Sequence, residues 1–173
     1  MKKNIMLIGF MGAGKTTVSR ELSILTGRKE IDMDAYIVEK EGCSINDIFK
    51  NHGEEYFRQL ETRYLADIQR ERGLIVSCGG GAVIKDENVK LMKENGVIVL
   101  LTALPETIYE RVKNSKDRPI LNGNMNIEFI TGLMNKRKDR YYEVADIIVE
   151  TDKKSIKNIC GEIMEKYSNI NML

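Results

Sequence analysis

One glycine-rich run near the amino terminus has the residue types and the spacing of a phosphate-binding loop. The run is Gly9-Phe10-Met11-Gly12-Ala13-Gly14-Lys15-Thr16, and it matches GxxxxGK[ST] at every fixed position between an expected strand and an expected helix. Glycines let a backbone wrap closely around an anion, so that successive N–H groups point at phosphate oxygens. Lys15 should reach the β- and γ-phosphates of a nucleotide, and the Thr16 hydroxyl should ligate Mg²⁺. The run therefore predicts a nucleotide-binding site.

Two carboxylates, Asp32 and Asp34, stand at the end of the second expected strand. Strand side chains alternate, so residues two apart point the same way, and both carboxylates are expected to enter one space beside the nucleotide. One could position Mg²⁺ through water, and the other could accept a proton or hydrogen bond from a substrate hydroxyl. The alternative is that Asp34 only caps the following helix.

Further features could contact a phosphoryl acceptor, and each also has a plainer explanation. Arg58 should lie at the edge of the apolar face of a long helix, where it could bind a substrate or merely pair with Glu61. The Gly79-Gly80-Gly81 run could let the backbone approach a ligand, or it could form a simple tight turn. The third quarter of the chain carries a basic group, namely Arg111, Arg118, Arg137 and Arg140. Arg118 lies in a polar stretch suited to a mobile lid, although most surface arginines do nothing specific.

Strand and helix patterns alternate along the chain. The expected strands are 4–8, 30–32, 74–78, 97–102 and 146–150. The expected helices are 16–26, 35–41, 45–52, 54–72, one capped by Asp86 that stops near Gly96, one opened by Pro105, 127–142 and 155–167. Val18, Leu22 and Leu25 should mark the inner face of the first helix. This order predicts an α/β fold, a three-layer α/β/α sandwich with a five-stranded parallel sheet, formed by residues 1–173 as a single domain. Ligands in such folds bind beyond the carboxyl ends of the strands.

The overall composition excludes several classes of partner. Lysine plus arginine total 27 and aspartate plus glutamate 26, a net charge of +1 that gives no global basic field for nucleic acid or membrane surfaces. No apolar run approaches the length of a membrane span. The three cysteines, Cys43, Cys78 and Cys160, have no CxxC spacing, which argues against zinc and suits reduced thiols in a cytoplasmic protein. No helix shows a sustained heptad seam, so we expect a monomer.

A phosphate loop alone does not establish a kinase. A GTPase would need a base-reading NKxD motif, and the nearest segment, residues 135–138, carries Lys138 where the aspartate must stand. That segment also lies inside an expected helix. A large motor or transporter ATPase would need more chain than 173 residues.

Six motifs in this order resemble the shikimate kinase family from about residue 4 to residue 151. They are Gly9–Thr16, Asp32–Asp34 as DxD, Phe57–Glu61 as FRxxE, Gly79–Gly81, Arg118–Leu121 as an RPL-like run, and Arg137–Tyr141 as RxxxY. The resemblance implies a P-loop kinase fold like that of nucleoside monophosphate kinases, with strand order 2-3-1-4-5, a substrate-binding region at 31–61 and a mobile lid at about 114–126. It also implies that ATP phosphorylates the 3-hydroxyl of shikimate, on the route to chorismate and the aromatic amino acids.

The same resemblance implies roles for individual residues. Catalysis would fall to Lys15, Asp34 and Arg118. ATP would contact Gly12, Ala13, Gly14, Lys15, Thr16, Thr17, Arg111 and Arg118. Shikimate would contact Asp34, Arg58, Gly79, Gly80, Gly81 and Arg137, beside an apolar wall of Phe49 and Phe57. Mg²⁺ would be held by Thr16 and, through water, by Asp32. One departure is that residues 151–156 lack the proline that the family often carries near adenine.

The residues support this assignment independently of the resemblance. Guanidinium groups are planar bidentate partners for a carboxylate, which suits Arg58 and Arg137 to the acid group of the acceptor. A gluconokinase-like enzyme would need similar chemistry, and the FRxxE and RxxxY motifs speak against it. A catalytically silent nucleotide-binding module is the other alternative, and the retention of Lys15, Thr16, Asp34 and Arg118 argues against that.

Overall fold

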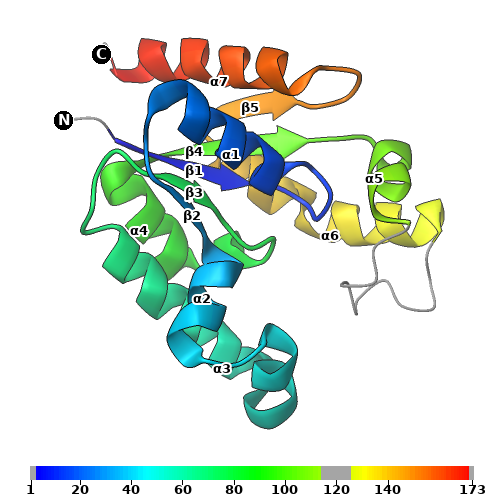
Figure 1. Ribbon diagram of the computed structural model, residues 1–173. Helices are drawn as coiled ribbons and strands as arrows, with labels where there is room; N and C mark the ends of the chain where they lie inside the picture. Colours follow the sequence, from blue (N-terminus) through cyan, green and yellow to red (C-terminus); the bar gives the residue numbers. More distant parts are fainter. Residues whose placement is uncertain (1–2, 114–125, 172–173) are drawn as a thin grey trace.

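The computed structural model describes residues 3–113 and 126–171 and contains all five expected strands in one parallel sheet (Figure 1). The strands are β1 (Asn4–Ile8), β2 (Glu30–Asp32), β3 (Ile75–Ser77), β4 (Gly96–Thr102) and β5 (Ile147–Glu150). Their order is β2-β3-β1-β4-β5, and every neighbouring pair is parallel. The predicted fold class and strand order are therefore confirmed.

The central strand β1 is covered on both faces, which explains its continuous apolar sequence. All five of its residues are buried. Ile5 is paired with Ile75 of β3 on one side and with Val97 of β4 on the other. Both faces of a parallel sheet are covered by the helices that connect its strands, so such a strand does not alternate between polar and apolar residues. The loop after β1 consequently starts in the middle of the sheet edge.

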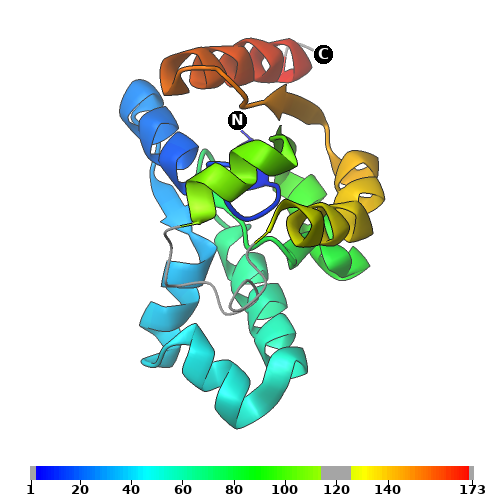
Figure 2. The ribbon, with the colours of Figure 1, turned by 90° about the vertical axis from the view of Figure 1, so that its right-hand side faces the viewer.

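Helices cover both faces of the sheet and extend beyond it. Their bounds are α1 (Lys15–Thr26), α2 (Met33–Glu41), α3 (Ile45–Ile68), the 3₁₀ turn η1 (Ala82–Ile84), α4 (Asp86–Asn95), α5 (Pro105–Val112), α6 (Ile127–Val144) and α7 (Ile156–Asn171). Helices α1 and α7 lie on one face, and α4 and much of α3 lie on the other (Figure 1). Figure 2 looks onto the carboxyl ends of the strands, where α5 crosses in front of the loop after β1. Each face of the sheet has its own apolar cluster, so the molecule holds two cores separated by the sheet.

Several predicted boundaries differ from the structure for local reasons. Helix α2 begins at Met33 rather than at residue 35, because Asp32 already caps it. The two helices expected around residue 53 are joined in α3, and Gly53 supplies the break between them with φ 81° and ψ 175°. Asp86 is the first residue of α4 and not its cap, a position that Lys85 occupies. Leu25, expected on the inner face of α1, is 57% exposed, whereas Val18 and Leu22 are buried, so the inner face of the helix does not include Leu25.

Two properties of the described chain bear on its surroundings. Within residues 3–113 and 126–171, every helix falls short of the length and apolar character that crossing a membrane requires. Cys43, Cys78 and Cys160 are free thiols, the last two buried. Burial raises the pKa of Cys160 to about 11 and raises that of Cys78 further, so both thiols stay protonated near neutral pH.

Candidate active site

The glycine-rich loop between β1 and α1 has a backbone that side chains would obstruct. Gly9 and Gly12 have φ values of 142° and 77°. A Cβ atom at Gly9 would collide with the carbonyl oxygen of Leu101, and one at Gly12 would lie 2.8 Å from Val112 Cγ1. Only glycine therefore lets the loop lie so close to β4 and α5. The strand–loop–helix context predicted for this motif is confirmed.

Lys15 begins α1 and folds its side chain back over the loop. Its Nζ donates hydrogen bonds to the carbonyl oxygens of Gly9 and Phe10, at 2.8 and 3.1 Å. The first N–H groups of α1 and the positive end of its dipole point into the same space. An ammonium group and a helix amino terminus thus meet at the carboxyl end of the central strand, an arrangement suited to polyphosphate.

A hydrogen bond joins the loop to the second strand. The Thr16 hydroxyl donates to Asp32 Oδ2 at 3.1 Å. The other oxygen of that carboxylate accepts from the backbone N–H groups of Asp34 and Ala35, at 3.1 and 3.2 Å. Asp32 is thereby fixed in orientation, with one oxygen capping α2 and the other directed at Thr16.

Asp34 differs from the expectation in its local structure but faces the expected region. Strand β2 ends at Asp32, so Asp34 lies in the first turn of α2, and the argument from strand alternation was wrong for this pair. The alternative role considered for Asp34, capping the helix, belongs instead to Asp32. Asp34 is exposed, and its Oδ1 lies 3.3 Å from the position that a Cβ atom at Gly79 would take. The carboxylate therefore lies beside the glycine turn.

Arg58 is held by two glutamates of its own helix. Its Nη1 pairs with Glu61 Oε2 at 2.5 Å, and its Nη2 pairs with Glu54 Oε1 at 3.0 Å. The Arg58 side chain is 14% exposed and that of Glu61 is 2% exposed. Burial raises the pKa of the Glu61 carboxyl above its ordinary 4.5, and the Arg58 charge partly opposes that rise. The pairing with Glu61 that the sequence suggested is present, and it fixes the guanidinium against the glycine turn.

Side chains pack closely on two of the three glycines in this turn, Gly79 and Gly81. A Cβ atom at Gly81 would lie 2.5 to 2.7 Å from three atoms of the Arg58 guanidinium, and one at Gly79 would lie 2.8 Å from Glu61 Oε1. A Cβ atom at Gly80 would come within 3.5 Å of Arg137 Nη1. The turn is thus the place where Arg58 of α3 and Arg137 of α6 come together, on adjacent glycines.

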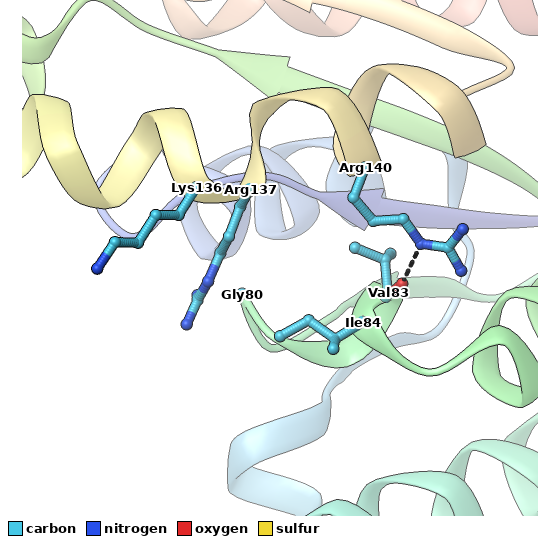
Figure 3. Close-up of a pocket in the computed structure, with 6 residues that line it drawn as sticks. All are labelled: Gly80, Val83, Ile84, Lys136, Arg137 and Arg140. Carbon is cyan, nitrogen blue, oxygen red and sulfur yellow. Dashed lines mark hydrogen bonds between the residues drawn. The ribbon is translucent and has the colours of Figure 1, made fainter.

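Helix α6 is anchored to this turn by Tyr141. Tyr141 lies four residues after Arg137 and donates its hydroxyl to the carbonyl oxygen of Gly80 at 2.6 Å. Burial raises the pKa of Tyr141, so the hydroxyl remains a donor. Figure 3 shows Arg137 passing beside Gly80, whereas Arg140 turns the other way and donates to the Val83 carbonyl oxygen at 2.8 Å. Arg140 also pairs with Asp86 and Glu143, so it fastens α6 and does not face the glycine turn.

The aromatic pair expected at the acceptor site is present on α3. The rings of Phe49 and Phe57 lie 4.9 Å apart between centroids, tilted by 34°. Phe57 is buried, whereas Phe49 is 37% exposed. The Arg58 guanidinium lies 5.3 Å from the Phe57 ring centroid. An apolar surface therefore borders the guanidinium group.

The residues expected near adenine are only partly described. Arg111 of α5 donates to the Gly12 carbonyl oxygen at 3.1 Å and to the Thr151 hydroxyl at 3.0 Å, which ties the phosphate loop to the segment after β5. Thr17 lies exposed at the start of α1. Arg118 and most of the stretch expected to form a lid, residues 114–125, lie outside the described residues. Asn126, the last residue of that stretch, caps α6 by accepting a hydrogen bond from Phe129 N.

Sequence reasoning gave no role to two side chains that organise this site. Tyr141 was noted only as the end of a motif, and Glu54 was not noted as a second partner of Arg58. A signal for Glu54 was available, since residues four apart on a helix face each other and Glu before Arg is the favourable order. The Tyr141–Gly80 contact joins residues 61 positions apart, and no local pattern predicts it.

Together these groups can perform phosphoryl transfer to a hydroxylated carboxylate. The P-loop and Lys15 can hold a polyphosphate, and the Thr16–Asp32 pair offers hard oxygen ligands. Arg58 and Arg137 can bind an anionic group at the glycine turn, where the Asp34 carboxylate can accept a hydrogen bond from a hydroxyl group. Within the described residues no cluster of three or more His, Cys, Asp or Glu side chains could hold a metal ion. A Mg²⁺ ion that is bound mainly by nucleotide phosphates and water does not need such a cluster.

Comparisons with known proteins agree with this chemistry. Residues 11–168 match a family model described as shikimate kinase. A curated shikimate kinase of Dehalococcoides mccartyi is 42% identical over 171 residues, 97% of each chain, and one of Geobacter metallireducens is 43% identical over 93% of this chain and 89% of its own. A solved shikimate kinase of Acinetobacter baumannii in complex with shikimate has a TM-score of 0.92 and 33% identity, covering 100% of this chain and 97% of the other. A gluconokinase from Sinorhizobium meliloti reaches a TM-score of 0.59 at 15% identity, over 97% of this chain and 93% of its own, a likeness of fold alone.

Proposed function

Because this chain belongs to the shikimate kinase family, we propose that it transfers the γ-phosphoryl group of ATP to the 3-hydroxyl of shikimate. The products are shikimate 3-phosphate and ADP. The observation that carries the proposal is the meeting of Arg58 and Arg137 on adjacent glycines of one turn, with Asp34 beside it. Two guanidinium groups and one carboxylate suit an acceptor with one acid group and several hydroxyls.

On the nucleotide side, the backbone of Gly12, Ala13 and Gly14 cradles the phosphates. Lys15 exchanges its carbonyl partners in the loop for the β- and γ-phosphate oxygens, where its charge stabilises the transferring phosphoryl group. Thr17 and Arg111 flank the nucleoside. The role of Arg118, neutralising the same phosphoryl group, stands on the family resemblance alone.

Thr16 directly, and Asp32 through water, are the residues proposed to hold Mg²⁺. Their donor set fits this ion, since hydroxyl and carboxylate oxygens are the hard ligands that it prefers, with phosphate and water oxygens completing its coordination. When bound, Mg²⁺ supplies positive charge that neutralises the phosphate oxygens. Asp32 is already held in one orientation, because its Oδ1 accepts hydrogen bonds from two backbone N–H groups of α2.

On the acceptor side, Arg58 and Arg137 bind the shikimate carboxylate and Asp34 accepts a hydrogen bond from a hydroxyl group. Glu61 and Glu54 hold the Arg58 guanidinium in one orientation before substrate arrives, which lowers the entropy lost on binding. Phe49 and Phe57 provide the apolar surface beneath the ring. Phosphoryl transfer through a loose transition state needs little base strength, so orientation of the hydroxyl is the larger contribution of Asp34.

Turnover in an ADP-release assay with shikimate and with gluconate tests this assignment. We expect efficient turnover with shikimate and at least about a hundredfold lower kcat/KM with gluconate, a difference of about 2.8 kcal/mol. A preference for gluconate would instead favour a gluconokinase-like enzyme. Nucleotide binding without turnover of either acceptor would indicate a catalytically silent module. Lys15→Met serves as the inactive control in the same assay.

We further propose that the enzyme works as a monomer in the cytoplasm. Its free thiols Cys43, Cys78 and Cys160 suit a reducing compartment. Size-exclusion chromatography with light scattering tests the monomer, with an expected mass near the 19.8 kDa of one chain.

A further inference from the structure

A cavity lies between α6 and the carboxyl ends of β4 and β5. Its volume is about 460 Å³, within the range of roughly 300–1,000 Å³ typical of small-molecule sites. Among the described residues that line it, none belongs to the set assigned above to ATP or shikimate. Leu100, Met134 and Tyr141 give it an apolar wall, and Phe10 brings it into contact with the phosphate loop.

Charged side chains of both signs line the cavity without partners. In the described parts of the chain, the side chains of Lys138, Glu150 and Lys153 take part in no hydrogen bond or ion pair. Arg58 and Arg140, by contrast, are each paired with two carboxylates. Two ammonium groups and one carboxylate are thus left available around one hollow.

The backbone at Lys153 is strained. Lys153 has a φ of 54°, and it is the one residue other than glycine with positive φ in the described chain. The left-handed conformation costs a residue with a side chain roughly 1–2 kcal/mol. The preceding residues hold it there, because Asp152 accepts from Leu104 N at 3.1 Å and the Thr151 hydroxyl donates to the Thr102 carbonyl oxygen at 3.0 Å. Such strain persists where the surroundings fix it, and it gathers at ligand sites.

Large apolar groups at the cavity remain in water. Leu104 is 56% exposed and Tyr142 is 47% exposed, and both line the cavity. A bound apolar group would cover part of this surface and gain roughly 25 cal/mol for each Å² removed from water.

We propose that this cavity binds a small zwitterion with an apolar side chain, the chemical class of the larger hydrophobic amino acids. Lys138 and Lys153 pair with its carboxylate, Glu150 pairs with its ammonium group, and its side chain packs on the apolar wall near Tyr142. A phosphorylated ligand would set a multiple negative charge against the carboxylates of Glu150 and Asp152. A purely apolar ligand would leave the charged groups at the cavity without partners.

The test measures binding to the intact enzyme by calorimetry, with saturating shikimate and a non-hydrolysable ATP analogue filling the active site. The probes are L-phenylalanine, 3-phenylpropionate, which lacks the ammonium group, and 2-phenylethylamine, which lacks the carboxylate. We expect L-phenylalanine to bind at least about tenfold more tightly than either analogue. All three share the phenyl ring, so the comparison isolates the two charges.

Two exposed variants locate the site. Glu150→Gln should weaken L-phenylalanine about tenfold without weakening 3-phenylpropionate, and Lys138→Met should weaken both. The matched control is Lys157→Met, an exposed lysine on α7 that does not line the cavity, and it should change neither. The proposal is overturned if no heat of binding appears up to about 10 mM L-phenylalanine. Equal affinities for the three probes, or wild-type affinity for L-phenylalanine in both cavity variants, would overturn it as well.

Discussion

Gly81→Ala is a small change that should move the Arg58 guanidinium without disturbing the backbone. Gly81 has a φ of −100°, which any residue adopts, so the effect of the new methyl group is purely steric. That Cβ atom would lie 2.5 Å from Arg58 Nη1, and ordinary contact begins at 3.4 Å. The guanidinium must therefore retreat by 3.4 − 2.5, or about 0.9 Å.

Such a displacement should impair recognition of the acceptor more than that of the nucleotide. A misplacement of about 1 Å in a bidentate group can cost on the order of 10²-fold, so kcat/KM for shikimate should fall about 10- to 100-fold. This corresponds to about 1.4–2.8 kcal/mol. The KM for ATP should stay within about twofold, because Arg58 has no contact with the phosphate loop in the described structure.

The measurement is an ADP-release assay in which shikimate and ATP are varied separately. The matched control is Gly161→Ala in α7, where a Cβ atom meets nothing within 4 Å. That change should leave catalysis intact and raise the free energy of unfolding by up to about 1 kcal/mol, through helix propensity. Wild-type kcat/KM for shikimate in Gly81→Ala would refute the assignment of Arg58 to the carboxylate. An equal loss for ATP and shikimate would mean that the whole site had rearranged.

Three other substitutions test separate parts of the site. Lys15→Met should lower kcat by a factor on the order of 10³ while its circular dichroism stays native, and substantial turnover in the folded variant would contradict the role of Lys15. Arg58→Ala and Arg137→Ala should each cost roughly 2–5 kcal/mol in kcat/KM for shikimate and much less for its methyl ester, with non-additive losses in the double variant; equal losses for acid and ester would disprove carboxylate recognition. Arg58→Ala should also raise the pKa of Glu61 further, since the Arg58 charge now lowers it, and carboxyl NMR titration would show the shift. A raised carboxyl pKa stabilises the fold below its ordinary 4.5 and loses that contribution as pH rises through the raised value, so the variant should lose more stability in urea at pH 8 than at pH 4.5.

The parts of the fold that the sequence predicted are those determined by local chemistry. Gly9, Gly12 and Gly14 predict a loop whose backbone has positive φ values at these positions. The alternation of strands and helices leaves few possible arrangements for a parallel sheet. The error at Asp34 came from extending a strand period of two beyond a strand of three residues. The strand ends at Asp32, because that residue caps helix α2, and Asp34 therefore lies in the helix.

The long-range contacts of the site could not have been predicted from local patterns. The sequence indicated that Arg58 might pair with Glu61 because the two are three residues apart on one helix. It gave no sign that Gly81 would lie under the guanidinium, because that contact depends on how α3 packs against the segment after β3. The sequence offered two interpretations of the triple glycine, a close approach to a ligand or a tight turn, and neither included the room that Gly79 and Gly81 make for the side chains of Glu61 and Arg58.

The central position of β1 has a consequence for how this chain folds. Ile5 pairs with Ile75 and with Val97, which are 75 − 5 = 70 and 97 − 5 = 92 residues later in the chain. During synthesis, one edge of β1 therefore stays unpaired until β3 has been made, and the other edge stays unpaired until β4 has been made. Closing such long loops costs entropy before any pairing energy is recovered, which slows folding. Over that interval the nascent β1 is an apolar segment that can associate with other chains, so its protection during synthesis depends on chaperones or on rapid completion of β3 and β4.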